Sequence, residues 1–240
     1  MATTHSSPTP AVPPRLTFSR GFTLVEMAVV LLIVTLLIAG MVLPLSAQQE
    51  IRARQETEKA LGDIQEALVG YAAGHAASDN RPHLPCPDTD NPPDGMENRQ
   101  ASGACTAEEG VLPWAELGLG RNDAWNNRFR YRVSAAFSNR GAGFTLGSSG
   151  DIEVCQDAGC VARIAVNVPA VILSHGPNGF GAFNSSGTLN ASPVDGDELE
   201  NTDGDKRFVS KTTDGAFDDM LVFVPATTLA NRMISAGRLP

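Results

Sequence analysis

Carboxylate side chains crowd the stretch between residues 176 and 219, which is otherwise rich in Gly, Asn and Ser. Oxygen-rich loops with Gly turns suit Ca²⁺, a hard cation that takes roughly six to eight oxygen ligands. No EF-hand pattern is present, and acidic loops are often simply solvated, so both interpretations stay open. The candidate calcium ligands, chosen because they cluster next to predicted strand starts, are Asp203, Asp205, Asp218 and Asp219.

A second pair with possible chemistry is Ser174 beside His175. Nucleophilic catalysis needs a hydroxyl that faces its base, which adjacent residues rarely do, and no G-x-S-x-G elbow surrounds Ser174. His83 has no nucleophile or second base nearby and is interpreted as a structural residue. We therefore predict that the chain is not an enzyme.

Four cysteines form two local pairs in the sequence, Cys86 with Cys105 and Cys155 with Cys160. An even count with short spacings predicts two disulfides in an oxidising compartment. A zinc site that adds His83 is the alternative, although neither pair has the C-x2-C spacing of zinc knuckles.

Glu26 is the one carboxylate placed in an apolar run, since no charged residue follows it from Met27 to Leu45. Residues 22–45 in a helix would be about 36 Å long, enough to cross a hydrocarbon core of about 30 Å. A carboxylate in that setting is expensive and needs a partner or a function.

Residues 21–26 read Gly-Phe-Thr-Leu-Val-Glu, directly before this apolar run. The segment resembles the N-terminus of type IV pilins and of the pseudopilins of type II secretion. The resemblance implies that a prepilin peptidase cuts after Gly21 and that the new N-terminal Phe22 is methylated. It also implies that Glu26 guides assembly, by pairing with the ammonium of Phe22 of its own or a neighbouring subunit.

The resemblance implies a pilin-like α+β fold, in which a long N-terminal helix packs on a small antiparallel β-sheet. The expected parts are a cleaved leader at 1–21, a long helix at 22–75 that is transmembrane over 22–45, and a periplasmic globular domain at 76–240. The helix shows an apolar stripe at Leu61, Ile64, Leu68 and Tyr71 where it should meet the domain.

Residues 123–127 read Asp-Ala-Trp-Asn-Asn and predict a turn before a strand. The segment looks like the Asp-Pro-Trp-Gly-Asn segment of major pseudopilins, with Ala124 in place of Pro and Asn126 in place of Gly. Major pseudopilins also carry a calcium site in the corresponding C-terminal loop, which supports the calcium hypothesis above.

Alternation and turn residues predict further strands and one more helix. A hairpin is expected from 152–155 and 160–168, and the run 220–224 is apolar throughout and so expected in the sheet centre. A helix should follow Pro225.

The formal net charge is −9, and an acidic surface argues against nucleic-acid binding. Basic residues flank the apolar run on both sides and leave the positive-inside rule close to neutral. The cysteines and the pilin-like motif place the chain as a single-pass protein of the bacterial inner membrane, with its C-terminal domain in the periplasm.

The sequence thus predicts a structural subunit of a type II secretion pseudopilus, assembled into a periplasmic filament. A minor pilin of a type IV pilus is the first alternative, favoured by the long insertion at 76–122 and the cysteines. A membrane-anchored periplasmic enzyme or binding protein is the less favoured one. The expected partners are prepilin peptidase, other pilin or pseudopilin subunits, an inner-membrane assembly platform and membrane lipid.

Overall fold

The computed structural model describes residues 21–194 and 196–240, and within the first helix the side chains of residues 40–46 lie outside the description. The predicted leader therefore lies outside the described residues except for Gly21. The described residues divide into two compact units, with the boundary between Gln48 and Gln49. The second unit begins within the predicted long helix, because the later turns of that helix share the core of the globular part.

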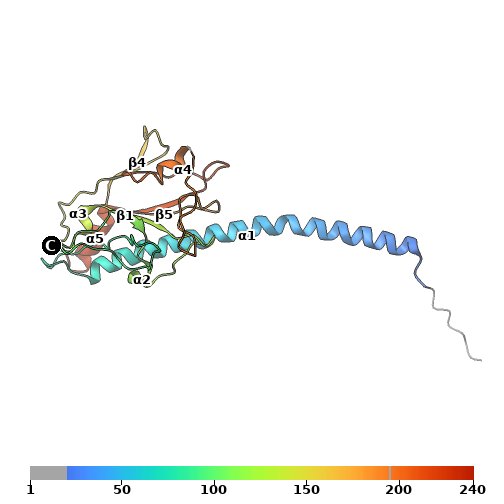
Figure 1. Cartoon of the computed structure of the whole chain (residues 1–240), viewed down its shortest axis with the longest axis horizontal. Coiled ribbons are helices and arrows are strands. Elements are labelled where there is room, and N and C mark those ends of the chain that lie inside the picture. The colour runs from blue at the N-terminus through green and yellow to red at the C-terminus, as the bar shows by residue number, and fades with distance from the viewer. Residues whose placement is uncertain (1–20, 195) are drawn as a thin grey trace, which may run out of the picture. The chain divides into compact units, whose positions relative to one another are not determined.

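The longest element is helix α1, Leu24–Gly74, which agrees with the predicted long helix (Figure 1). Among the residues whose side chains are described, no helix is long and apolar enough to cross a membrane. The predicted span at 22–45 runs into residues 40–46, whose side chains are outside the description.

A four-stranded antiparallel sheet packs against α1, so the predicted α+β arrangement of helix on antiparallel sheet is confirmed. Leu61, Ile64 and Leu68 of α1 are buried together with Tyr131 and Ile172 of the sheet. The apolar stripe predicted on the helix is therefore its buried face. The strand order is β1 (Glu109–Val111), β2 (Arg130–Val133), β5 (Ala170–Ser174) and β7 (Met220–Val224).

A second sheet of three strands lies on the other side of β5. Its order is β4 (Arg163–Val168), β3 (Ile152–Cys155) and β6 (Arg207–Val209). The β3–β4 pair is the predicted hairpin, whereas β6 pairs with β3 in parallel and was not predicted. Ile152, Val154 and Phe208 form a separate apolar cluster with Val171 of β5, while Ile172 belongs to the helix-side core. Strand β5 is thus buried on both faces.

The prediction that residues 220–224 form a central strand was wrong, because β7 lies at the edge of its sheet. Met220 and Val222 pack on the helix-side core, whereas Leu221 and Phe223 pack against the cluster of the second sheet. The strand is apolar throughout because both of its faces are covered, not because strands lie on both sides. Gln65 of α1 donates to the carbonyl of Phe223 at 2.7 Å.

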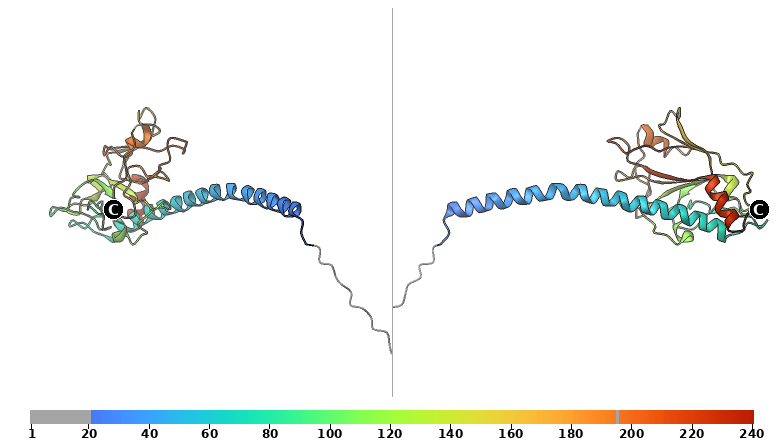
Figure 2. Two further views of the ribbon diagram at one scale, coloured as in Figure 1. Left: turned by 45° about the vertical axis from the view of Figure 1, so that its right-hand side comes forward. Right: turned by 180° about the vertical axis from the view of Figure 1, so that it is seen from behind.

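The remaining helices are short except for α5, Ala226–Ser235, which follows Pro225 as predicted. Leu229 and Met233 of α5 are buried in the helix-side core, and Arg232 reaches Glu66 of α1 at 3.3 Å. Figure 2 shows α5 beside the later turns of α1. The short helices are α2 (Trp114–Leu117), α3 (Ala135–Ser138) and α4 (Gly196–Glu200).

The loop between α1 and β1 has little regular structure but is held by polar contacts. Cys86 and Cys105 form the predicted disulfide. Arg99 is buried in an ion pair with Glu97 at 2.6 Å and donates to the carbonyl of Leu84 at 3.0 Å. Buried charges need such partners, so this guanidinium helps to order the loop, together with the apolar packing of Leu84 in the helix-side core.

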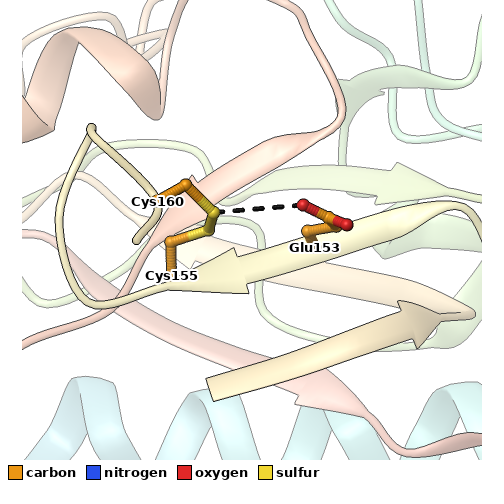
Figure 3. A group of neighbouring side chains, drawn as sticks. All are labelled: Glu153, Cys155 and Cys160. Carbon is orange, nitrogen blue, oxygen red and sulfur yellow. Dashed lines mark hydrogen bonds between the residues drawn. A yellow bond between two sulfur atoms is a disulfide. The ribbon is translucent and has the colours of Figure 1, made fainter. Parts of the chain in front are cut away.

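The second predicted disulfide, Cys155–Cys160, is also formed and closes the end of the β3–β4 hairpin (Figure 3). Glu153 lies beside this bridge, 3.9 Å from the sulfur of Cys160, and pairs with Arg163 at 3.2 Å. Because the sulfurs are bonded to each other, neither cysteine pair offers thiolate ligands to the alternative zinc site.

Candidate functional site

The N-terminal end of α1 is held by a reciprocal pair of side chains. The Thr23 backbone N–H donates to Glu26 Oε2 at 2.8 Å, and the Glu26 N–H donates to Thr23 Oγ1 at 3.2 Å. The Thr23 hydroxyl also donates to Glu26 Oε2 at 2.9 Å. This is a capping box, in which the Thr before a helix and the Glu three residues later satisfy each other's backbone donors. Sequence analysis assigned Glu26 to assembly and missed this role, although Thr-x-x-Glu is its signature.

The side chains around this helix cap are exposed on the surface of the chain. Phe22 is 82% exposed, and the apolar residues that follow it in α1 are exposed as far as Ala39. Before cleavage the nitrogen of Phe22 is part of a peptide bond and carries no charge. Glu26 therefore has Thr23 as its partner in the uncleaved chain, and an ammonium partner can exist only after processing.

The four predicted calcium ligands fall into two separate groups. Asp218 and Asp219 lie with Glu198, whereas Asp203 and Asp205 lie with Glu200. Within each group, one carboxylate oxygen from each residue is within 4.8 Å of the others. The structure therefore brings together two pairs of the predicted residues, but not all four.

The carboxylates of Glu200, Asp203 and Asp205 already have a positively charged neighbour, the side chain of Arg207. Arg207 Nη2 is 3.0 Å from Glu200 Oε1, and Arg207 Nε is 3.1 Å from Asp205 Oδ2. The backbone N–H of Arg207 also donates to Asp205 at 2.6 Å. Two of the three carboxylates are thus neutralised within the protein, and this group fits a metal ion poorly.

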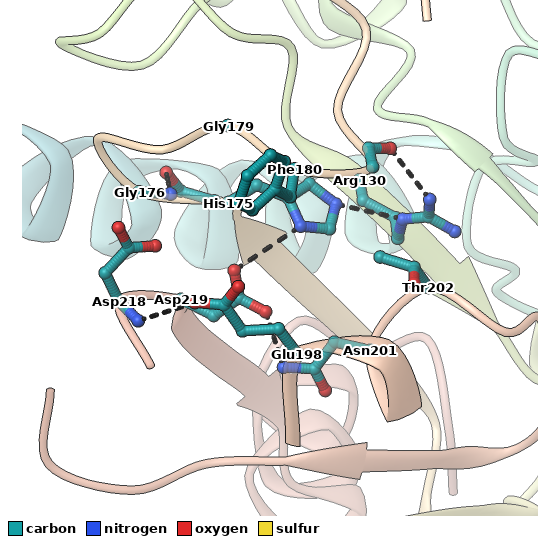
Figure 4. Close-up of polar contacts among 12 residues, drawn as sticks. Arg130, His175, Gly176, Gly179, Phe180, Glu198, Asn201, Thr202, Asp218 and Asp219 are labelled. Atoms are coloured by element: carbon teal, nitrogen blue, oxygen red, sulfur yellow. Dashed lines mark hydrogen bonds and ion pairs between the residues drawn. The ribbon is translucent and has the colours of Figure 1, made fainter. Parts of the chain in front are cut away.

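The group of Glu198, Asp218 and Asp219 is named here the carboxylate cluster (Figure 4). Unlike the other group, its negative charges are not neutralised by an Arg or Lys among the described residues. Glu198 and Asp219 are buried, and none of the three forms an ion pair with a Lys or Arg among the described residues. Among the described residues, the buried oxygens Asp218 Oδ1 and Asp219 Oδ1 have no hydrogen-bond donor. Burial raises the pKa of Asp218 to about 6, and the charges of Glu198 and Asp219 add to the effect.

Amide groups hold the carboxylate cluster in place. Asn178 Nδ2 donates to both oxygens of Glu198, at 3.0 and 3.1 Å, and Asn201 Nδ2 donates to Asp219 Oδ2 at 2.8 Å. The backbone N–H of Asp218 donates to Glu198 Oε1 at 3.0 Å. Three clustered carboxylates, two of them buried, that pair with no Lys or Arg among the described residues fit a hard divalent ion. Glu198 was missed as a ligand because only the folded chain brings α4 to the start of β7.

The predicted turn at 123–127 is present and is built on Asp123. Its Oδ1 accepts the backbone N–H of Trp125 at 3.0 Å and of Asn127 at 2.8 Å. Asn126 has φ +66°, a left-handed conformation that Gly adopts freely and Asn tolerates. Asn126 therefore allows this turn without a Gly at its position. Burial raises the pKa of Asp123.

This turn connects α1 to the loop that carries the carboxylate cluster. On one side Trp125 Nε1 donates to Glu50 of α1 at 3.4 Å. On the other, Asn127 Nδ2 donates to the carbonyl of Gly176 at 3.3 Å, and Ser174 donates to Asp123 Oδ2 at 2.7 Å. The turn thus fixes the loop that begins at the end of β5.

Ser174 and His175 do not form a nucleophile–base pair. The Ser174 hydroxyl is used by Asp123, whereas His175 Nε2 accepts from Arg130 Nε at 3.1 Å. Ser174 is the last residue of β5 and His175 comes directly after it, and successive residues of an extended chain point to opposite faces. This geometry agrees with the sequence-based argument against catalysis at this pair.

The Arg side chains in β2 and just before it contact acidic and aromatic partners within the chain. Arg130 and Arg132 both pair with Glu109 of β1. Arg128 lies over the ring of Trp114, 4.4 Å from its centroid. These three Arg side chains are therefore engaged within the chain and do not form the free basic patch of a nucleic-acid site.

Comparison with known proteins finds a family match for the N-terminal segment. Residues 17–42 match the family model of the prokaryotic N-terminal methylation motif. No curated protein and no solved structure matches the chain. The match covers the N-terminal segment alone, and there it confirms the predicted resemblance to type IV pilins and pseudopilins. The motif implies membrane anchoring through the N-terminus, processing by prepilin peptidase and assembly with other pilin subunits.

Proposed function

We propose that this chain is a structural subunit of a type II secretion pseudopilus. The single observation that carries this is the methylation motif with Gly21, Phe22 and Glu26 at the start of a helix whose first turns expose apolar side chains. The subunit sits in the bacterial inner membrane as a single-pass protein, with residues 22–45 as the span. Its C-terminal domain lies in the periplasm, where both disulfides are stable.

Assembly follows from a change of partner at Glu26. In the uncleaved chain the carboxylate is satisfied by Thr23 in the capping box. Cleavage after Gly21 creates an ammonium at Phe22, and this cation pairs with Glu26 of the same or a neighbouring subunit. A buried pair of this kind fixes register between packed helices more reliably than it adds stability.

The turn at Asp123 favours a pseudopilus over a pilus. Asn126 has a left-handed backbone where the similar pseudopilin segment has Gly, and the turn ties α1 to the loop of the carboxylate cluster. We assign a calcium site to that cluster, with Asp218 and Asp219 from the predicted set and Glu198 replacing Asp203 and Asp205. Calcium would hold together three carboxylates that otherwise repel one another.

A minor pilin of a type IV pilus is the second candidate. The observation that favours it is the loop between α1 and β1, which has its own disulfide and a buried Arg99–Glu97 pair. Such an ordered insertion departs from a compact major subunit and offers a surface of its own to a neighbour in a filament.

Two measurements test the proposal. Mass spectrometry of the mature protein should find a methylated Phe22 at the N-terminus, and any other start would remove the basis of the assignment. Deletion of the gene in its host should then abolish protein secretion and leave surface pili intact. Loss of surface pili with normal secretion would favour the minor pilin instead.

A further inference from the structure

His175 lies buried between a cation and the carboxylate cluster, and it has no part in the function proposed above. Its side chain is 1% exposed. Nε2 faces Arg130 Nε at 3.1 Å, and Nδ1 faces Asp219 Oδ1 at 3.4 Å (Figure 4). The imidazole is therefore the direct connection between Arg130 and one member of the cluster.

The contact with Arg130 determines which nitrogen of the ring carries the proton. A guanidinium N–H can only donate, so Nε2 of His175 must accept. In the neutral imidazole the proton then resides on Nδ1, the nitrogen that faces Asp219. Arg130 cannot turn away easily, since it pairs with Glu109 and donates to the carbonyl of Gly181 at 3.0 Å.

Asp219 uses its two oxygens differently. Oδ2 accepts from Asn201 at 2.8 Å, whereas Oδ1 has, within the described part of the chain, only the long approach of His175 Nδ1. Both Oδ1 of Asp219 and Nδ1 of His175 are buried, and neither forms a well-formed hydrogen bond with the residues that the structure describes. A buried donor outside the cluster is thus aimed at the free oxygen within it, which points to a carboxylate oriented for a ligand.

We propose that His175 is a positioning residue for the cation site: its Nδ1–H holds Asp219 so that this carboxylate can bind a calcium ion. His175 itself does not touch the ion, because Ca²⁺ prefers oxygen ligands. Partners that orient metal-binding side chains typically contribute a factor of about 10 to 100 in metal affinity. This inference rests on the calcium site proposed above.

The test is calcium titration by calorimetry on the full chain in mild detergent, comparing three substitutions at one position. His175→Asn keeps an N–H close to the place of Nδ1 and should bind calcium within about threefold of the wild type. His175→Gln carries its amide farther out, towards the place of Nε2, and His175→Leu has none. Both should bind about 10- to 100-fold more weakly.

The outcomes separate this inference from the site itself. If the wild type binds calcium and all three variants bind equally well, His175 only fills space and the inference is wrong. If the wild type does not bind calcium, the proposed site fails and the inference fails with it. Should His175→Leu not fold, the Asn and Gln variants still decide, because both are polar and differ in where the donor lies. Nitrogen NMR of the wild type should show the proton on Nδ1 of His175, and a proton on Nε2 would also overturn the proposal.

Discussion

The N-terminal segment and the carboxylate cluster place carboxylates in opposite settings. Glu26 lies three residues from its partner Thr23, on the exposed end of a helix. Asp219 is 3% exposed, and its neighbours Glu198 and His175 come from distant parts of the chain. The first arrangement needs only one turn of helix, whereas the second exists only when two sheets and two loops have packed.

This difference separates two kinds of function. Changes in residues 21–26 should alter processing and assembly and leave the globular unit intact, since that unit begins at Gln49. Changes around the carboxylate cluster should alter the stability and ion binding of that unit and leave processing intact. Each prediction below tests one side of this separation.

The largest effect is expected for Glu26→Ala in filament assembly. Cleavage and membrane insertion should survive, because removing a charge makes the apolar run more apolar. Incorporation should fail, because an unpaired ammonium among packed helices costs about 3–5 kcal/mol, on the order of a hundredfold or more. The assay compares the subunit in membranes with the subunit in sheared or cross-linked filaments.

Glu26→Gln is the matched control, because Gln also completes a capping box but carries no charge. We expect it to fail in assembly as Glu26→Ala does. Normal incorporation of the Gln variant would show that the cap with Thr23, and not the charge, is what assembly requires.

Calcium should stabilise the globular unit by about 2.7 kcal/mol at about a hundredfold excess over the dissociation constant. Unfolding of the full chain in detergent, followed by the fluorescence of Trp114 and Trp125, measures this with calcium and with a chelator. Asp219→Asn should remove the difference between the two conditions.

Asp205→Asn is the control for the calcium effect, since Asp205 pairs with Arg207 in the other acidic group. This variant should respond to calcium as the wild type does. A response lost in Asp205→Asn and kept in Asp219→Asn would move the site to the Asp203–Asp205 group.

Asp123→Ala should lower the free energy of unfolding by about 1–3 kcal/mol, because two backbone donors and the Ser174 hydroxyl lose their acceptor. Asn126→Gly should change it by less than about 1 kcal/mol, since Gly accepts the left-handed backbone at this position. Chemical denaturation measures both. Processing at Gly21 should be unchanged in each variant, and a processing defect would break the separation of the two regions.

The smallest effect concerns pH. Burial lowers the pKa of His83 below its usual 6.5, and the nearby Arg99 adds to this. Below about pH 6.5 the unfolded chain therefore binds more protons at this residue than the folded chain does. The free energy of unfolding should fall as pH drops through this range, by at most about 1.4 kcal/mol per pH unit.

His83→Gln should flatten the pH dependence between pH 7 and pH 5 relative to the wild type, because the amide does not titrate. Denaturant unfolding at several pH values measures this. Parallel curves for the two proteins would show that His83 has the same pKa in the folded and unfolded chain.

Several features could be predicted from the sequence because their causes are local. The motif at 21–26 is consecutive, the long helix follows from its apolar run and stripe, and both disulfides join cysteines close in sequence. The turn at 123–127 was also predicted, because Asp and Asn favour turns through their own side chains. The capping box at Thr23 could also have been predicted, from the Thr-x-x-Glu pattern of Thr23 and Glu26, but was not.

The position of β7 in its sheet and the grouping of the acidic residues were decided by the tertiary structure, because both depend on which surfaces pack together. The apolar run of β7 could not distinguish a central strand from an edge strand covered on both faces. The acidic residues of 198–219 look alike in the sequence, yet the fold gives Arg207 to one group and His175 to the other. A cation site depends on the charges left unpaired after folding, and a list of acidic residues does not contain that information.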